Sequence, residues 1–307
     1  MPVNYFDHIV IGAGSMGSSA CYHIAKRGLS VLGIEQFTIP HEKGSHGGQS
    51  RIIRKAYFEH PDYIPLLHKA YENWKEIEER SGEKLYEEAG LLYTGPRGNE
   101  LIEAVRRAAR MYQIPLIGYS HAELKTAFPS INIPADYDIL FEPEAGLLYP
   151  GKCIKAFVEE AINLGAVIHT NEKVKEWKVE GDKVMVTTDK DQYSCKKLVI
   201  TAGAWSAQMI PGINEKLKVT RQILVWVDPA KKENYAIGKF PCWLIAKNGL
   251  PGCYYGFPFI PKSGDEQEEG LKLAYHHPDR ETDPDHPDRQ VKDAELEVLK
   301  QIAKEYL

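Results

Sequence analysis

The sequence predicts an α/β fold that contains a dinucleotide-binding unit at its N-terminus. An apolar run over residues 6–11 leads into a turn with Gly12, Gly14 and Gly17, a helical stretch follows, and a second apolar run ends at Glu35. A G-x-G-x-x-G pattern alone is weak, but here a strand precedes it, a helix follows it, and an acidic residue comes about twenty residues later. This order indicates a Rossmann unit rather than a glycine-rich packing turn.

The glycines and the start of the helix have separate tasks in such a unit. Gly12 permits the tight turn, Gly14 lets the backbone approach a pyrophosphate, and Gly17 lets the helix pack closely on the strand. Ser15 and Met16 then begin a helix whose N-terminus faces the phosphates.

The end of the second strand supplies the ribose contact. Glu35 is placed to accept hydrogen bonds from ribose hydroxyls, and Gln36 follows it directly. Several dinucleotides share this unit, so the first 36 residues alone would equally permit an NAD-dependent dehydrogenase.

The composition fits a protein with a sizeable core and excludes some partners. Hydrophobic residues make up 43% of the 307 residues, which allows two domains, and the net charge is −5. No basic stripe is present, so we expect no nucleic-acid partner. No leader and no apolar run of the ~18 residues that span a bilayer is visible, so we expect no membrane partner. Five cysteines without a C-x-x-C pair favour a reduced, cytoplasmic protein.

The spacing of apolar residues, together with residues that begin or end helices, predicts the other helices and strands. Helical periodicity, the capping box of Ser120 and Glu123 and the stop at Gly165 indicate helices. The helices are expected over residues 63–80, 99–111, 120–128, 152–164 and 291–307. Short β-branched and aromatic runs indicate strands, with a hairpin that turns at Gly181 and Asp182. The strands are expected near residue 86 and over residues 90–94, 166–169, 174–179, 183–188, 197–201, 222–227 and 242–259.

Three further segments have features of a ligand site. Residues 41–51 form a polar loop that is too polar to be core, and its glycines allow close approach to a ligand. Ala202 and Gly203, which precede Trp205, would let the backbone approach the nucleotide a second time. Residues 270–276 form one compact segment between polar stretches.

These segments occur in an order that resembles the monomeric sarcosine oxidase family, the flavin-dependent amine oxidases of N-methyl amino acids. The resemblance rests on the nucleotide unit, the loop from Ser45 to Arg54, the turn at 201–205 and the segment 270–276, and it extends over essentially the whole chain. It implies a glutathione-reductase-type FAD-binding Rossmann domain and a second, mixed-sheet substrate domain. The FAD domain is expected at residues 1–85 and 146–220, the substrate domain at 86–145 and 221–290, and a C-terminal helix at 291–307.

The resemblance also implies a reaction and its residues. In the family, a secondary amine such as sarcosine is oxidised to an imine, and oxygen is reduced to hydrogen peroxide. Arg51 and Lys272 would flank the flavin ring, with Lys272 activating oxygen. Arg54 would hold the substrate carboxylate, while Tyr255 and His276 would line the substrate pocket. The implied FAD contacts are Gly12, Gly14, Ser15, Met16, Gly17, Glu35, Gln36, Ser45, His46, Ser50, Arg51, Val174, Ala202, Gly203 and Trp205.

The resemblance leaves several points open. The small-molecule amine is not determined, since relatives oxidise sarcosine, N-methyltryptophan, pipecolate, glycine and glycated amino acids, and we expect a monomer by analogy alone. Gly47 stands where sarcosine oxidase proper has a second consecutive histidine. The family's FAD-linking cysteine would lie beyond Leu307, so we expect a truncated sequence. A degenerate, non-catalytic FAD-binding protein therefore stays an alternative. His276, His277 and nearby aspartates have no fixed ligand spacing, and we expect no metal site.

Overall fold

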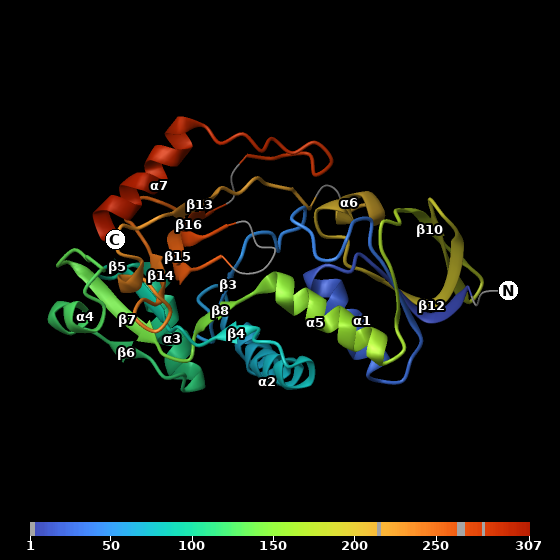
Figure 1. Cartoon of the computed structure of the whole chain (residues 1–307), viewed down its shortest axis with the longest axis horizontal. Helices are drawn as coiled ribbons and strands as arrows, with labels where there is room; N and C mark the ends of the chain where they lie inside the picture. The colour runs from blue at the N-terminus through green and yellow to red at the C-terminus, as the bar shows by residue number, and fades with distance from the viewer. Residues whose placement is uncertain (1–3, 214–215, 263–267, 278–279) are drawn as a thin grey trace. The chain divides into compact units, whose positions relative to one another are not determined.

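The chain folds into two compact units in a computed structural model that describes residues 4–213, 216–262, 268–277 and 280–307 (Figure 1). The first unit comprises Met1–Gln49, Lys75–Leu85 and Tyr149–Val219, and the second comprises Ser50–Trp74, Tyr86–Leu148 and Thr220–Leu307. These units differ from the predicted domain boundaries mainly at residues 50–74, which group with the second unit. Residues 146–148, Thr220 and the C-terminal helix also belong to the second unit.

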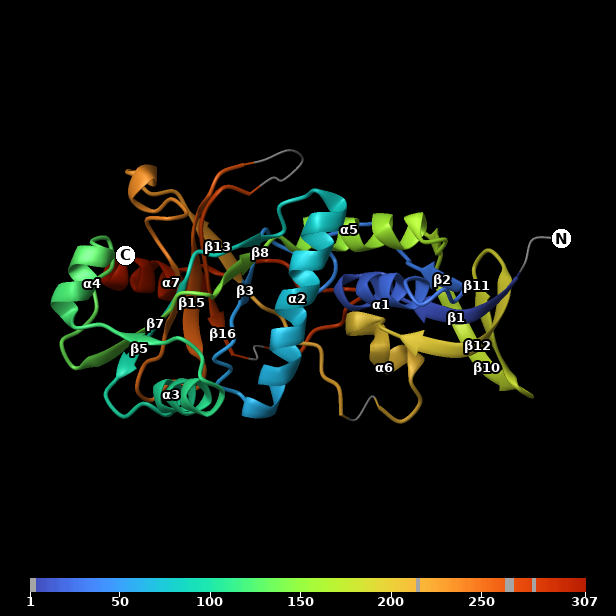
Figure 2. The same cartoon turned by 90° about the horizontal axis from the view of Figure 1, so that it is seen from below.

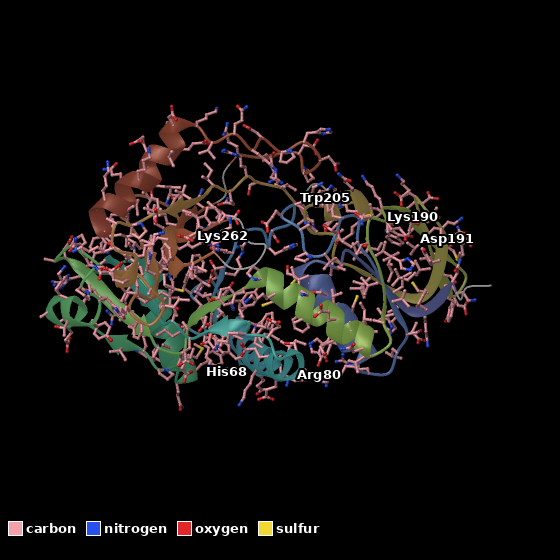
Figure 3. All side chains as sticks on the ribbon, in the orientation of Figure 1. His68, Arg80, Lys190, Asp191, Trp205 and Lys262 are labelled. Atoms are coloured by element: carbon pink, nitrogen blue, oxygen red, sulfur yellow. The ribbon has the colours of Figure 1, made fainter. Side chains whose placement is uncertain are left out.

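The first unit is built on a six-stranded sheet with the strand order β10-β11-β12-β1-β2-β9. Its strands are β1 (Tyr5–Ile11), β2 (Val31–Ile34), β9 (Val167–His169), β10 (Val174–Glu180), β11 (Lys183–Thr188) and β12 (Gln192–Ile200). Strands β12, β1, β2 and β9 run parallel, whereas β10, β11 and β12 form an antiparallel meander. Lys190 and Asp191 mark the turn that joins β11 to β12 (Figure 3).

Two helices, α1 (Ser15–Ala25) and α5 (Pro150–Asn163), pack side by side in this unit (Figure 1). Gly33 of β2 allows α1 to approach, because a Cβ there would lie 2.9 Å from Cys21 Sγ. The opposite side of the sheet has its own core, in which Ile9, Leu32 and Tyr193 are buried together. Burial on both sides is typical of a Rossmann sheet.

The second unit contains a seven-stranded mixed sheet with the order β13-β16-β15-β14-β5-β7-β6. Its strands are β5 (Leu91–Pro96), β6 (Ile117–Gly118), β7 (Tyr137–Glu142), β13 (Leu224–Val227), β14 (Cys242–Ile245), β15 (Cys253–Ile260) and β16 (Gly270–His276). A three-stranded sheet in the same unit consists of β3 (Arg51–Ile53), β8 (Gly146–Leu148) and β4 (Tyr86–Glu87).

Successive side chains along a strand point to opposite sides of the sheet, so the seven-stranded sheet has two different faces. One face carries Trp243, Tyr254 and Leu273, which form an apolar core with α4 (His121–Ala127) and α7 (Asp293–Tyr306) (Figure 2). Tyr255 neighbours Tyr254 and therefore points to the other face. That other face carries the polar residues of the candidate substrate site.

The remaining helices lie close to their predicted positions. They are α2 (Ile64–Ser81) and α3 (Glu100–Tyr112), whereas the short α6 (Ser206–Met209) was not predicted. The capping box of Ser120 and Glu123 is present at the start of α4. None of the helices in the described part of the chain is long and apolar enough to cross a membrane.

One expectation about the loop at 41–51 was wrong. The loop was expected to be too polar for the core, yet His46, Gln49 and Ser50 are buried, and Arg51 begins strand β3. The backbone explains part of this burial, because the Ser50 carbonyl accepts hydrogen bonds from two cationic side chains. Polar residues can be buried when their polar groups are paired in this way.

Candidate functional site

A cavity of 380 Å³ lies in the first unit at the carboxyl ends of β1, β2 and β12. This edge of a parallel sheet is where Rossmann folds bind dinucleotides. The sequence-predicted residues that line it are Gly12, Gly14, Ser15, Met16, Glu35, Gln36, Ser45, His46, Val174, Ala202, Gly203 and Trp205. Trp205 is 7% exposed, lies on the turn before α6 (Figure 3), and packs edge-on against Phe37.

The glycine turn has the geometry that close backbone approach requires. Gly12 has φ +87°, a conformation that residues with a side chain rarely adopt. A Cβ on Gly17 would lie 1.8 Å from the carbonyl oxygen of Gly12, and one on Gly14 would lie 3.3 Å from His46 Cε1. Helix α1 has no side-chain cap and no acidic residue in its first turn. Its N-terminal amides are therefore suited to a phosphate group.

Glu35 is a buried carboxylate that stands at the edge of the cavity. One oxygen accepts a hydrogen bond from the Ala13 backbone amide at 3.0 Å, and the other accepts one from the Phe37 amide at 3.0 Å. His41 Nε2 lies 3.6 Å from the second oxygen. Each carboxylate oxygen has two acceptor positions, so Glu35 keeps capacity for ribose hydroxyls. These residues fit the nucleotide part of FAD.

Replacement of Gly17 by alanine tests this packing. The new methyl group cannot be placed beside the Gly12 carbonyl without moving α1 or the turn, so we expect FAD affinity to fall by at least about tenfold. Titration of the apoprotein with FAD, followed by flavin fluorescence, measures the change. Gly151→Ala is the matched control, because a Cβ on Gly151 of the same unit would have no neighbouring atom within 4 Å and its φ is not positive. Equal FAD affinity in wild type and Gly17→Ala would contradict the assignment.

In the second unit, strand pairing brings three residues of the predicted catalytic site to one face. Cys253 pairs with His276, and Tyr255 pairs with Ala274, in antiparallel register. Paired residues in neighbouring strands share a face, and Lys272 is two residues from Ala274. Tyr255, Lys272 and His276 therefore lie on the face opposite the apolar core. The rings of Tyr255 and His276 are 6.1 Å apart in an edge-on arrangement.

Two of the predicted cations meet at a single backbone carbonyl. The Ser50 carbonyl oxygen accepts hydrogen bonds from Lys272 Nζ at 2.5 Å and from Arg51 Nη1 at 2.7 Å. Lys272 is 1% exposed, and its ammonium lies 4.4 Å from the centre of the Phe257 ring. Ser50 Oγ is buried and has no hydrogen-bond partner among the described residues. This group therefore combines concentrated positive charge with a hydroxyl available to a ligand.

Arg54 is held on the same unit by aromatic rings and a carboxylate. Its guanidinium lies 4.5 Å from the Tyr57 ring centre and 4.4 Å from that of Phe58. Nη2 donates to both carboxylate oxygens of Glu59, at 2.7 and 2.6 Å. Its buried Nε has no hydrogen-bond partner within the described ranges. Arg54 thus already binds one carboxylate and retains a donor for another.

Burial and nearby positive charges shift the pKa values of His276 and Tyr255. Burial, assisted by the Arg54 charge, lowers the pKa of His276 below 6.5, so its imidazole is neutral at pH 7. Burial raises the pKa of Tyr255 while the nearby Arg51 charge opposes that rise, so the phenol stays protonated. Tyr255 can therefore donate a hydrogen bond, and His276 can accept one.

Sequence reasoning missed several residues of the first cavity. These are Glu172, Lys173, Gln208 and Met209, while His41, Gly44 and Thr201 lie in the predicted loop 41–51 and turn 201–205 but were not named as contacts. Glu172 and Lys173 directly precede Val174, and Thr201 directly precedes Ala202, so each could have been found by extending a predicted contact by one or two residues. Gly17, Ser50 and Arg51 do not line this cavity. Gly17 lies in its supporting turn, and the other two belong to the second unit.

Comparison with known proteins identifies the family. The family model described as FAD dependent oxidoreductase matches residues 7–307. The chain belongs to this FAD-dependent oxidoreductase family. The predicted α/β fold and the predicted FAD cofactor are thereby confirmed, and a nicotinamide enzyme is no longer an alternative.

Relatives within the FAD-dependent oxidoreductase family are similar over most of the chain. Monomeric sarcosine oxidase from Bacillus sp. (strain NS-129) is 34% identical over 287 residues, which are 92% of this chain and 71% of that protein. N-methyl-L-tryptophan oxidase from Yersinia pestis (strain Pestoides F) is 32% identical over 274 residues, which are 89% of this chain and 70% of that protein. The predicted resemblance to this group is therefore confirmed.

Solved structures of the family share the fold. The open form of NikD, an amino acid oxidase essential for nikkomycin biosynthesis, superposes with a TM-score of 0.78 at 20% identity, covering 99% of this chain and 78% of that one. L-proline dehydrogenase from P. horikoshii gives a TM-score of 0.77 at 19% identity, covering 100% of this chain and 78% of that one. Both similarities concern the fold alone.

Proposed function

We propose that this FAD-dependent oxidoreductase oxidises the secondary amine of an N-methyl or related amino acid to an imine and reduces oxygen to hydrogen peroxide. The observation that carries the proposal is Arg54, an arginine that already binds a carboxylate and whose buried Nε has no partner in the described chain. Sarcosine and N-methyl-L-tryptophan, named in the relatives' descriptions, both carry a carboxylate. A guanidinium is the side chain best suited to bind it.

The protein's own residues would divide the work. Arg54 would bind the substrate carboxylate in place of Glu59, while Tyr255 would donate a hydrogen bond and the neutral His276 would accept one. Together these contacts would fix the amine, and orientation of this kind supplies much of an enzyme's rate enhancement. When bound, FAD supplies the two-electron acceptor that no side chain offers.

Lys272 has the properties expected of the group that activates oxygen. A fixed ammonium stabilises the negative charge that develops on oxygen as it is reduced. The hydrogen bond to the Ser50 carbonyl and the contact with Phe257 hold this ammonium in place. Arg51, which donates to the same carbonyl, would add a second positive charge.

The charge state of His276 gives a direct test of this electrostatic arrangement. We expect the pKa of His276 to lie below 6.5 in the wild type and to rise in Arg54→Met, because the Arg54 charge opposes a second positive charge nearby. Burial remains in the variant, so the pKa should stay below 6.5. The pH dependence of the His276 ring signals in NMR spectra measures both values. A wild-type pKa at or above 6.5 would contradict this electrostatic arrangement.

Product analysis tests the reaction itself. The purified holoenzyme is mixed with sarcosine or N-methyl-L-tryptophan in air, and oxygen uptake, hydrogen peroxide and formaldehyde from imine hydrolysis are measured together. The proposal predicts equal amounts of the three with at least one of the two amines. Tightly bound flavin without oxygen uptake with either amine would favour a non-catalytic FAD-binding protein.

A further inference from the structure

We propose that Glu142 is a positioning residue that holds Arg54 in place for the substrate carboxylate. The inference rests on the proposed function, because it assigns Glu142 a task in substrate binding. Glu142 ends strand β7 and is 0% exposed. A buried carboxylate is costly unless it is fully hydrogen-bonded, so its bonding partners indicate what it does.

Glu142 binds the backbone that directly follows Arg54. Its Oε1 accepts a hydrogen bond from the Lys55 amide at 2.6 Å, and its Oε2 accepts one from the Ala56 amide at 3.2 Å. Oε2 also accepts a hydrogen bond from the Tyr93 hydroxyl at 2.7 Å. The contacts from residues 55 and 56 span 87 and 86 positions in sequence. Glu142 therefore ties the segment after β3 to the end of strand β7 in the large sheet.

The charges around Glu142 agree with this task. Its negative charge faces Arg54, Tyr93 and the backbone amides, while Lys55 pairs with the neighbouring Glu144. Burial raises the pKa of Glu142, and its hydrogen bonds and the Arg54 charge oppose that rise. Burial and the Glu142 charge raise the pKa of Tyr93 well above its usual value, so the phenol remains the donor.

Glutamine at position 142 would disturb this arrangement without changing its size. One of the two carboxylate oxygens would become an NH₂ group, which cannot accept a hydrogen bond. Either the Lys55 or the Ala56 amide would then face another donor. The segment that carries Arg54 would have to shift, and a small displacement of a binding group costs affinity.

Two matched variants distinguish a role of Glu142 in positioning Arg54 from a general effect on the stability of the fold. Glu144→Gln removes the ion pair with the Lys55 side chain but leaves the backbone bonds to Glu142 intact. Tyr93→Phe removes one donor to Glu142 and also leaves the backbone bonds in place. If Glu142→Gln fails to fold, Tyr93→Phe and Glu142→Asp carry the test, because both keep a carboxylate at position 142.

The decisive experiment is a double-mutant cycle with Arg54→Met, read as KM and kcat for sarcosine in the holoenzyme. Glu142→Gln is expected to raise KM about tenfold with kcat within about twofold. In the Arg54→Met background the same substitution should change KM by less than about twofold. Glu144→Gln should leave KM within about twofold of wild type, and Glu142→Asp or Tyr93→Phe should have an intermediate effect.

Binding of an unreactive carboxylate keeps this test independent of catalysis. Methoxyacetate has the shape of sarcosine but no amine, and calorimetry measures its affinity for each variant. Weaker methoxyacetate binding in Glu142→Gln supports the proposal even if the wild type oxidises neither amine, an outcome that would overturn only the proposed function. An equal effect of Glu142→Gln with and without Arg54, or unchanged methoxyacetate affinity, would overturn the positioning role.

Discussion

Replacement of Lys272 by methionine is expected to slow the reaction of the reduced enzyme with oxygen by about 100- to 1000-fold. This is the loss seen when a single preorganised donor to a developing negative charge is removed. Methionine has nearly the length of lysine and fills the same space, but it lacks the ammonium. Anaerobic reduction by the amine should change by less than about threefold, because Lys272 is not proposed to bind the substrate.

Stopped-flow absorbance separates the two effects. The reduced variant is mixed with oxygenated buffer, and the return of the oxidised flavin bands is followed over time. Lys262→Met serves as the control, since Lys262 is an exposed lysine of the same unit (Figure 3). A Lys272→Met enzyme that reoxidises at the wild-type rate would remove Lys272 from the oxygen reaction.

Replacement of Arg54 by methionine is expected to lower kcat/KM for sarcosine about 100-fold. The estimate follows from the loss of two charge-assisted hydrogen bonds, each contributing about 1.5 kcal/mol. Sarcosinamide has the same amine but no carboxylate, so its kcat/KM should change by less than about threefold. The steady-state rates of both amines are measured in both enzymes. Equal losses for the two amines would mean that Arg54 supports the fold rather than the carboxylate.

Glu59 provides an internal control for the proposal that Arg54 binds the substrate carboxylate. The Glu59 carboxylate pairs with the Arg54 guanidinium, which the substrate carboxylate would need. Glu59→Gln should therefore lower KM for sarcosine, whereas Arg54→Met should raise it. Opposite shifts from the two halves of one ion pair are difficult to produce by destabilising the fold.

The glycine turn and Glu35 could be predicted from the sequence because they lie in one short stretch of chain, whereas Val174 and Ala202 join the same cavity from far along the chain. Gly12, Gly14 and Gly17 lie within six residues, and Glu35 follows at the end of the next strand. The backbone conformation at Gly12 and the contacts of Gly17 are local consequences of that order. A strand, a turn and a helix in sequence determine such geometry almost by themselves.

The substrate side depends on distant pairings, which no local pattern specifies. The Ser50 carbonyl meets Lys272 from 222 positions away, and Lys55 meets Glu142 from 87 positions away. The resemblance to sarcosine oxidases indicated Lys272 and Arg54 as candidates, but neither the shared carbonyl nor the role of Glu142 was foreseen. The burial of Ser50 was missed for the same reason, because Lys272, which donates to its carbonyl, is remote in sequence.

The central claim is that an amino-acid amine reduces an FAD bound to this chain. The most direct test is the visible absorption spectrum of the purified protein under anaerobic conditions, before and after addition of sarcosine, and in parallel of N-methyl-L-tryptophan. We expect oxidised flavin bands that bleach with at least one of these amines and return when air is admitted. Flavin bands that persist unchanged with both amines would contradict the claim.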